Sequence, residues 1–277
     1  MRVKIHKDEW DKYYYCGKQK FRQKRIIAAY KTQEIEKLNW FAKRRTTLET
    51  LEEETDKVRT CLGALESTGF LSTTGYDLPK FLEFRADVHK NFVIIWTAIS
   101  SVMEHLLYAI SAALQPERIL GLGIFTGNPL IWSLGPAIKE EYLVKHMAGV
   151  EIDPNHAKIC QENMNKVSPE RPVLIHAADG FDILETYADE SLDLLYLDAN
   201  GFDPVTQKSS KNINTTFLKR GYSKLKPGGA VICHNAYMPS FKRDASGYLE
   251  FTRNREFFQR TVTVAVDEMG IEFSIKK

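Results

Sequence analysis

Residues 118–127 read RILGLGIFTG, and residues 147–154 read MAGVEIDP. Each stretch begins as a short apolar run typical of a buried strand; the first then breaks into glycines, and the second ends on Glu151. In a doubly wound sheet, adjacent strand ends share one crevice, and ligands bind there. Glycine lets the backbone approach a ligand closely, and a carboxylate can accept both hydroxyls of a ribose. The two stretches together predict a site for a nucleoside-bearing cofactor, and therefore an enzyme.

The same alternation of strand, turn and helix continues over residues 116–277. We expect strands at 118–122, 147–151, 173–177, 192–198 and 230–234, helices at 129–141, 154–167, 181–187 and 214–225, and a β-ribbon from 260–266 and 271–275. Short strands that alternate with helices predict an α/β fold. We therefore expect a Rossmann-like, doubly wound, mainly parallel sheet with helices on both faces.

Residues 1–115 differ in composition from the rest. Residues 21–65 contain scarcely a helix breaker, and their apolar side chains recur at helical spacing, which predicts one long helix or two joined ones ending near residues 67–69. Further helices are expected at 78–88 and 92–114. We interpret residues 1–115 as a helical lid and substrate region, and residues 116–277 as the cofactor-binding domain.

Composition limits the class of protein. The net charge of +2 gives no general argument for nucleic-acid binding, and the basic, aromatic N-terminal residues are better explained as a helical face. The four cysteines include no CxxC pair, which favours reduced thiols in a cytoplasmic protein. The start of the chain is too charged for a signal peptide. Residues 92–114 could span a bilayer in length, but Glu104 and His105 near their middle favour a buried helix.

Further motifs follow in a fixed order. They are Asp179-Gly180-Phe181 after the third strand, Asp198 at the end of the fourth and Lys226-Pro227-Gly228-Gly229 before the fifth. With the first two stretches, this set resembles class I S-adenosylmethionine-dependent methyltransferases, most closely the O-methyltransferases of the catechol and caffeoyl-coenzyme-A type. The resemblance covers about residues 118–240 and includes the distinctive Phe125-Thr126-Gly127.

The resemblance implies S-adenosylmethionine as the cofactor and a role for each matching residue. The loop glycines would approach the methionine part, Glu151 would accept the ribose hydroxyls, and Ile152 would pack on the adenine face. Asp179 and Phe181 would bracket the adenine edge, although Asp179 could instead only cap a helix. The full implied set is Gly121, Gly123, Phe125, Thr126, Gly127, Glu151, Ile152, Asp179, Gly180, Phe181 and Asp198.

The chain departs from the family pattern where the chemistry is expected. Asn200-Gly201 replaces the acidic residue and lysine that usually follow the fourth strand, and His234-Asn235 stands where an Asp-Asn pair would complete a divalent-metal site with Asp198. His234 could favour a nitrogen-preferring metal, act as a general base, or only form local hydrogen bonds. We take Asp198 and His234 as candidate catalytic residues, assign no metal ligand, and leave a divalent metal open.

The function that follows is methyl transfer to a small molecule, with oxygen preferred as the acceptor atom over nitrogen or carbon. Transfer or cyclisation of the aminocarboxypropyl group, with release of methylthioadenosine, is an alternative, and a non-catalytic scaffold is a third. Candidate substrate contacts are Asn235 and three tyrosines that could supply hydroxyls or an aromatic wall beside the sulfonium, Tyr13, Tyr14 and Tyr15. A homodimer through the N-terminal helices is also possible. We expect no membrane partner.

Overall fold

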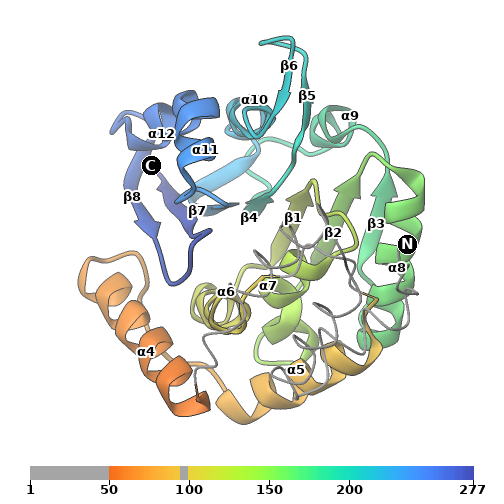
Figure 1. Ribbon diagram of the computed structural model, residues 1–277, viewed down its shortest axis with the longest axis vertical. Coiled ribbons are helices and arrows are strands. Elements are labelled where there is room, and N and C mark those ends of the chain that lie inside the picture. The colour runs from red at the N-terminus through yellow and green to blue at the C-terminus, as the bar shows by residue number, and fades with distance from the viewer. Residues whose placement is uncertain (1–49, 94–98) are drawn as a thin grey trace, which may run out of the picture.

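The computed structural model describes residues 50–93 and 99–277. Its centre is a seven-stranded sheet (Figure 1). The strands are β1 (Arg118–Leu122), β2 (His146–Glu151), β3 (Leu174–Ala177), β4 (Leu192–Leu197), β7 (Leu225–His234), β8 (Phe258–Val264) and β9 (Ile271–Lys276). They lie in the order β3-β2-β1-β4-β7-β9-β8; neighbours among the first five are parallel, and β9 is antiparallel to β7 and β8. The predicted mainly parallel sheet is confirmed, with a topological switch point between β1 and β4.

Helices bury both faces of the sheet. Along β4, Leu194 and Tyr196 belong to one hydrophobic cluster, and Leu195 and Leu197 belong to the other. The first cluster includes side chains of α4 (Leu51–Ser67), α5 (Leu78–Asn91), α6 (Ser101–Leu114), α7 (Asn128–Ile138) and α8 (Pro154–Val167). The second includes α9 (Gly180–Glu185), α10 (Ile213–Gly221), α11 (Pro239–Asp244) and α12 (Ser246–Arg253). Burial on both faces explains why the central strand β4 is an almost continuous apolar run.

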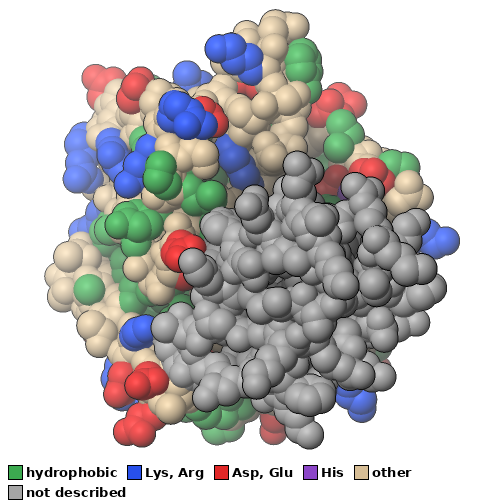
Figure 2. All heavy atoms as spheres, viewed as in Figure 1, with side chains coloured by type: hydrophobic (Ala, Val, Ile, Leu, Met, Phe, Trp, Pro, Cys, Tyr) green, Lys and Arg blue, Asp and Glu red, His purple; other side chains and the backbone are tan. Residues whose placement is uncertain are grey.

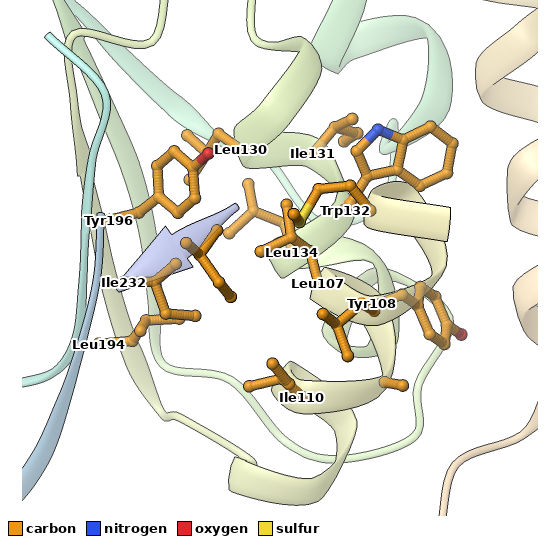
Figure 3. Close-up of a cluster of buried hydrophobic side chains, with 14 of the residues drawn as sticks. Leu107, Tyr108, Ile110, Leu130, Ile131, Trp132, Leu134, Leu194, Tyr196 and Ile232 are labelled. Carbon is orange, nitrogen blue, oxygen red and sulfur yellow. The ribbon is translucent and has the colours of Figure 1, made fainter. Parts of the chain in front are cut away.

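The first cluster joins the helices before residue 115 to the sheet. Figure 3 shows side chains of α6 and α7, among them Leu107 and Leu134, facing Tyr196 and Ile232 of the sheet. Trp132 and these four side chains are fully buried, and Leu107, Leu134 and Ile232 each contribute about 1.5–3 kcal/mol by leaving water. The described helices of the N-terminal region therefore share a core with the sheet, and the division of the chain near residue 115 stays a prediction.

The helix predicted over residues 92–114 is wrong in its start. Phe92, Val93, Ile99 and Ser100 are not helical, residues 94–98 lie outside the described residues, and α6 begins at Ser101. The Ser100 side chain accepts a hydrogen bond from the Met103 backbone N–H at 3.3 Å, which satisfies a donor of the first turn that has no carbonyl partner within the helix. As expected, α6 is buried. Within the described part of the chain, no helix is long and apolar enough to cross a membrane.

Polar partners inside the molecule surround His105 of α6. The buried His105 ring lies 2.7 Å from Glu54 through Nδ1 and 2.7 Å from the Tyr76 hydroxyl through Nε2. Arg85 donates to the same Glu54 carboxylate at 2.6 Å. Burial alone would raise the pKa of Glu54, but His105 and Arg85 outweigh burial and lower it. The cluster therefore ties α4, α5 and α6 together with an ionised carboxylate in the interior.

Other differences from the predicted elements are local. The predicted strand at 230–234 is extended back to Leu225, and residues 226–229 bulge out opposite Asp193, with Gly228 at φ +76°. The helix expected at 214–225 ends earlier, because α10 is Ile213–Gly221. The hairpin β5 (Gly201–Asp203) and β6 (Lys208–Ser210) was not predicted from the sequence, and neither were α11 and α12. The part of the predicted N-terminal helix before residue 50 lies outside the described residues.

The surface carries both signs of charge. In Figure 2, Lys and Arg side chains gather on the side of α12 and β8, and Asp and Glu side chains are visible elsewhere on the described surface. Some of these charges are paired, as in Lys145–Glu117 at 2.6 Å and Arg171–Glu140 at 2.9 Å. Such exposed pairs stabilise the fold by about 1 kcal/mol at most. The preference for a small molecule over a nucleic acid stays a prediction.

Candidate cofactor and acceptor site

The glycine-rich loop after β1 lies directly against the end of β2. The Gly123 backbone N–H donates to the Val150 carbonyl at 3.0 Å, and the Phe125 N–H donates to Glu151 Oε2 at 2.8 Å. Phe125 reaches this position with a left-handed φ of +52°. The two stretches that define the predicted cofactor site are therefore in contact, beside the switch point of the sheet.

The three glycines of this region have different roles. Gly123 has φ +72°, and a Cβ atom there would lie 2.3 Å from the Cα of Ala199, just past β4. Gly127 has φ +90° and is the N-cap of α7. Gly121 lies inside β1, where a Cβ would meet Leu130 of α7 at 2.9 Å. Gly121 thus serves helix packing in this structure, and its predicted contact with the cofactor stays a prediction.

Glu151 is buried and held in place by backbone donors. Its Oε2 accepts from Phe125 and its Oε1 accepts from the Asp153 N–H at 3.1 Å. Each carboxylate oxygen has a second lone pair, so two acceptor positions remain for ligand hydroxyls. The next residue, Ile152, is 71% exposed and offers an apolar surface beside that carboxylate. Glu151 is therefore not an exposed charge that only contacts solvent at the end of the strand.

The residues after β3 show the helix-capping arrangement that the sequence left open. Asp179 is the N-cap of α9, and its Oδ1 accepts from the Phe181 N–H at 2.9 Å. The Phe181 ring is buried against Phe217, with ring centroids 4.4 Å apart. A Cβ on Gly180 would meet the Phe217 ring at 2.8 Å. Phe181 therefore packs in the core, and contacts of this segment with adenine stay predictions.

Asp198 stands at the end of β4, on the other side of β1 from Glu151. Its backbone N–H donates to the Leu122 carbonyl at 3.1 Å, which continues the pairing of the two strands. Its carboxylate forms an ion pair with Lys211, and its Oδ2 lies 3.1 Å from His234 Nδ1. Burial alone would raise the pKa of Asp198, but Lys211 and His234 outweigh burial and lower it. The structure thus brings Asp198 and His234 together.

The His234 ring has one nitrogen in use and one without a partner. A carboxylate only accepts hydrogen bonds, so Nδ1–H donates to Asp198, and the lone pair of a neutral ring is on Nε2. Nε2 is buried and has no hydrogen-bond partner among the described residues. Asn235 follows with φ +70°, and its amide lies 3.2 Å from Met269 Sδ. Tyr13, Tyr14 and Tyr15 lie outside the described residues.

Comparisons with known proteins agree with this architecture. The chain is 16% identical to an O-methyltransferase from Bacillus cereus solved in complex with SAH, with a TM-score of 0.52 over 79% of this chain and 97% of that one. The chain has the class I methyltransferase fold. It is also 26% identical over 150 residues to a protein named as an O-methyltransferase from Mycobacterium sp. (strain KMS), covering 53% of this chain and 61% of that protein. A catechol O-methyltransferase from Niastella koreensis is 26% identical over 138 residues, covering 50% and 58%.

The resemblance to methyltransferases of the catechol type is thereby confirmed. The chain spans less than two thirds of the length of these two curated relatives. No family model matches the chain.

Lys211 forms an ion pair with Asp198 that was not predicted from the sequence. Lys211 contacts both the Asp198 carboxylate and, at 2.8 Å, the Asp198 backbone carbonyl. It arrives from a distant position because the chain after β4 first forms the β5–β6 hairpin and then returns. Asn214 fixes this return, since its side chain accepts from the Ala199 N–H at 3.0 Å and donates to the Ala199 carbonyl at 2.9 Å. No spacing rule could have found a lysine thirteen residues past Asp198.

A divalent metal does not fit the residues at this edge of the methyltransferase fold. Among residues 50–93 and 99–277, no group of three or more His, Cys, Asp or Glu side chains could hold a metal ion. Asp198 is the one carboxylate of the Asp198–His234–Asn235 set, and the Lys211 ammonium already occupies it. A hard cation such as Mg²⁺ needs several oxygen ligands, and one paired carboxylate does not provide them.

Proposed function

We propose that this protein is an S-adenosylmethionine-dependent methyltransferase that methylates an oxygen atom of a small molecule. The observation that carries the proposal is the bridge between Phe125 and Glu151, which presents a buried carboxylate beside the glycine-rich loop at the switch point. Ligands of doubly wound sheets bind at that point. The relatives named as O-methyltransferases support this choice of reaction.

The residues present suit this cofactor. The two spare acceptor positions of Glu151 match two ribose hydroxyls, and the exposed Ile152 side chain matches an adenine face. Thr126 Oγ1 in the loop and the amide of Asn128, the first residue of α7, are buried without a partner among the described residues. A buried polar group left unpaired costs about 1–3 kcal/mol, so a polar ligand group that bonds to it gains stability.

We propose that His234 removes the proton from an acceptor hydroxyl. The bound cofactor supplies a methyl group already activated by the sulfonium. Asp198 fixes the His234 ring with Nδ1–H donating, which leaves the Nε2 lone pair as the base. The acceptor oxygen would receive that methyl group, with the thioether of the cofactor as the leaving group, and His234 Nε2 would hold the proton that the acceptor hydroxyl loses. Asn235, next in the chain, would contact the acceptor.

The N-terminal region would close this site. Because α4, α5 and α6 share the core cluster with β4 and β7, the described part of that region is rigidly joined to the sheet. We propose that it positions the remaining N-terminal residues, with Tyr13, Tyr14 and Tyr15, over the acceptor. Exclusion of water from the site would follow.

Product analysis tests the reaction. The protein is incubated with S-adenosylmethionine and a panel of phenols and hydroxylated small molecules, and nucleoside products are separated by mass. We expect S-adenosylhomocysteine (SAH) and a methylated oxygen in the acceptor. Methylthioadenosine as the product would instead establish aminocarboxypropyl chemistry.

A variant separates the base from the binding site. His234→Gln can still donate to Asp198 but has no basic nitrogen, so kcat should fall by about 10²- to 10⁴-fold with unchanged SAH affinity. The matched control is His146→Gln, a half-buried histidine that contacts Tyr187 near the start of β2. An unchanged kcat in the His234 variant would contradict the assignment of the base.

A further inference from the structure

We infer that the Lys211 ammonium is the built-in cation of the acceptor site and takes the place of a divalent metal in this protein. The inference rests on the proposed methyl transfer and specifies its charge chemistry. The family resemblance implies a divalent metal beside Asp198, but the side chains around Asp198 are a lysine and a histidine.

The ammonium is bound to Asp198 by two contacts. Nζ lies against the Asp198 carboxylate and donates to the Asp198 backbone carbonyl at 2.8 Å. The two side chains are only 21% and 13% exposed, so the pair is far less screened than a surface ion pair. A divalent cation would have to displace this ammonium from a partly buried carboxylate. His234 on the other oxygen adds no second negative charge to favour that exchange.

The segment that carries Lys211 is held rigidly. Asn214 bonds to both backbone groups of Ala199, as described above, and donates to the Lys211 carbonyl at 2.9 Å. Next to Lys211, the Asn212 amide donates to Asp203 Oδ2 at 2.5 Å. Asp203 is fully buried in the hairpin and also accepts from other hydroxyl and backbone donors. The β5–β6 hairpin thus fixes the position of the lysine relative to the end of β4.

The arrangement leaves one donor for chemistry. An ammonium has three N–H donors, and the two contacts with Asp198 use two of them. The third can bond to the acceptor oxygen while the acceptor's hydroxyl proton moves to His234 Nε2. The oxygen then becomes negative beside a fixed positive charge. No divalent ion is needed for that stabilisation.

Metal binding tests the inference without any need for turnover. The full-length chain is titrated with Mn²⁺, and bound ion is measured by electron paramagnetic resonance, in wild type, Asp198→Asn and Asp193→Asn. Asp193 is the matched control, since it lies in β4 and pairs with Lys226 at 2.6 Å. We expect that the wild type binds no more Mn²⁺ than Asp198→Asn at millimolar concentrations of the ion. One Mn²⁺ per chain that is lost in Asp198→Asn and kept in Asp193→Asn would overturn the inference.

Turnover supplies a second readout. Once an acceptor has been identified, EDTA should not change the rate of methyl transfer. Lys211→Met should lower kcat by at least about 100-fold with little change in the KM for S-adenosylmethionine, as for loss of one oxyanion donor. Lys211→Arg keeps the charge and guards against a folding defect; it should stay metal-free and retain more activity than Lys211→Met. Lys226→Met should retain full activity.

The results separate this inference from the proposed function. Activity abolished by EDTA and restored by Mg²⁺ would overturn the inference while leaving methyl transfer intact. A wild-type protein that binds no S-adenosylmethionine and transfers no methyl group would refute the proposed function instead, and the Mn²⁺ titration would still decide the metal question.

Discussion

Replacing Gly123 with alanine should destabilise the protein by an amount that can be worked out from two contributions. Gly123 has φ +72°, and a side chain in this left-handed region costs about 1–2 kcal/mol. The added Cβ would also lie 2.3 Å from the Cα and 2.6 Å from the backbone N of Ala199. Backbone atoms cannot move aside by changing rotamer, so overpacking adds about 1–3 kcal/mol. The expected loss is about 2–5 kcal/mol in the free energy of unfolding.

Gly228→Ala is the matched control. Gly228 has a nearly identical φ of +76°, but no atom lies within 4 Å of an added Cβ. Urea unfolding should therefore show only the conformational cost of about 1–2 kcal/mol for this variant. The Gly123 variant should also bind SAH more weakly, because the displaced loop carries the Phe125 N–H away from Glu151. Equal losses of stability in the two variants would refute the close approach between the glycine-rich loop and the end of β4.

Two further changes test how the site is supported. The fully buried Asn163 amide forms three hydrogen bonds of 2.7–3.0 Å to backbone groups of the glycine-rich loop and of the segment after α5. Asn163→Ala should therefore lower the free energy of unfolding, measured in urea, by about 2–4 kcal/mol. A loss below about 1 kcal/mol would contradict those bonds. Glu54→Gln should cost about 3–5 kcal/mol near pH 7, because it removes the buried carboxylate that Arg85 and His105 contact and leaves Arg85 to the more distant Glu104 carboxylate at 3.6 Å. Since the pKa of Glu54 is lowered in the folded protein, its contribution is present above its ordinary pKa and is lost as the pH falls through the folded pKa. The gap between wild type and Glu54→Gln should therefore shrink below about pH 4, while the exposed Glu52→Gln gives no such gap; a gap constant from pH 7 to pH 3 would rule out the buried ion pair.

The parts of the fold that repeat were predictable from sequence. The central parallel strands β1 and β4 are short runs buried on both faces, and the turns that follow them contain glycine or aspartate. The contact of Glu151 with the glycine-rich loop was predictable for the same reason, because strand ends of a parallel sheet meet at one edge, and its role as a cofactor ligand stays a prediction. The local sequence pattern is sufficient to predict a contact when the two residues belong to neighbouring strands of the sheet.

Features that depend on distant contacts were not predictable. Lys211 reaches Asp198 only because the hairpin after β4 returns the chain to Ala199, and hairpin residues 201–210 carry no strong strand pattern. The start of α6 was misplaced because apolar residues 92–99 continue the helical composition, while the Ser100 cap sets the boundary. Gly121 matched the loop motif in sequence, but its packing against Leu130 appears only in three dimensions.

Calorimetric titration of SAH into the wild-type chain and Glu151→Gln tests the central claim most directly. We predict that the wild type binds one SAH per chain and that Glu151→Gln binds about 5- to 150-fold more weakly, which corresponds to the loss of about 1–3 kcal/mol for a charged hydrogen bond. Glu117→Gln, an exposed carboxylate before β1 that pairs with Lys145, should bind like the wild type. A wild type that does not bind SAH, or a Glu151→Gln variant with unchanged affinity, would contradict the placement of the cofactor at this carboxylate.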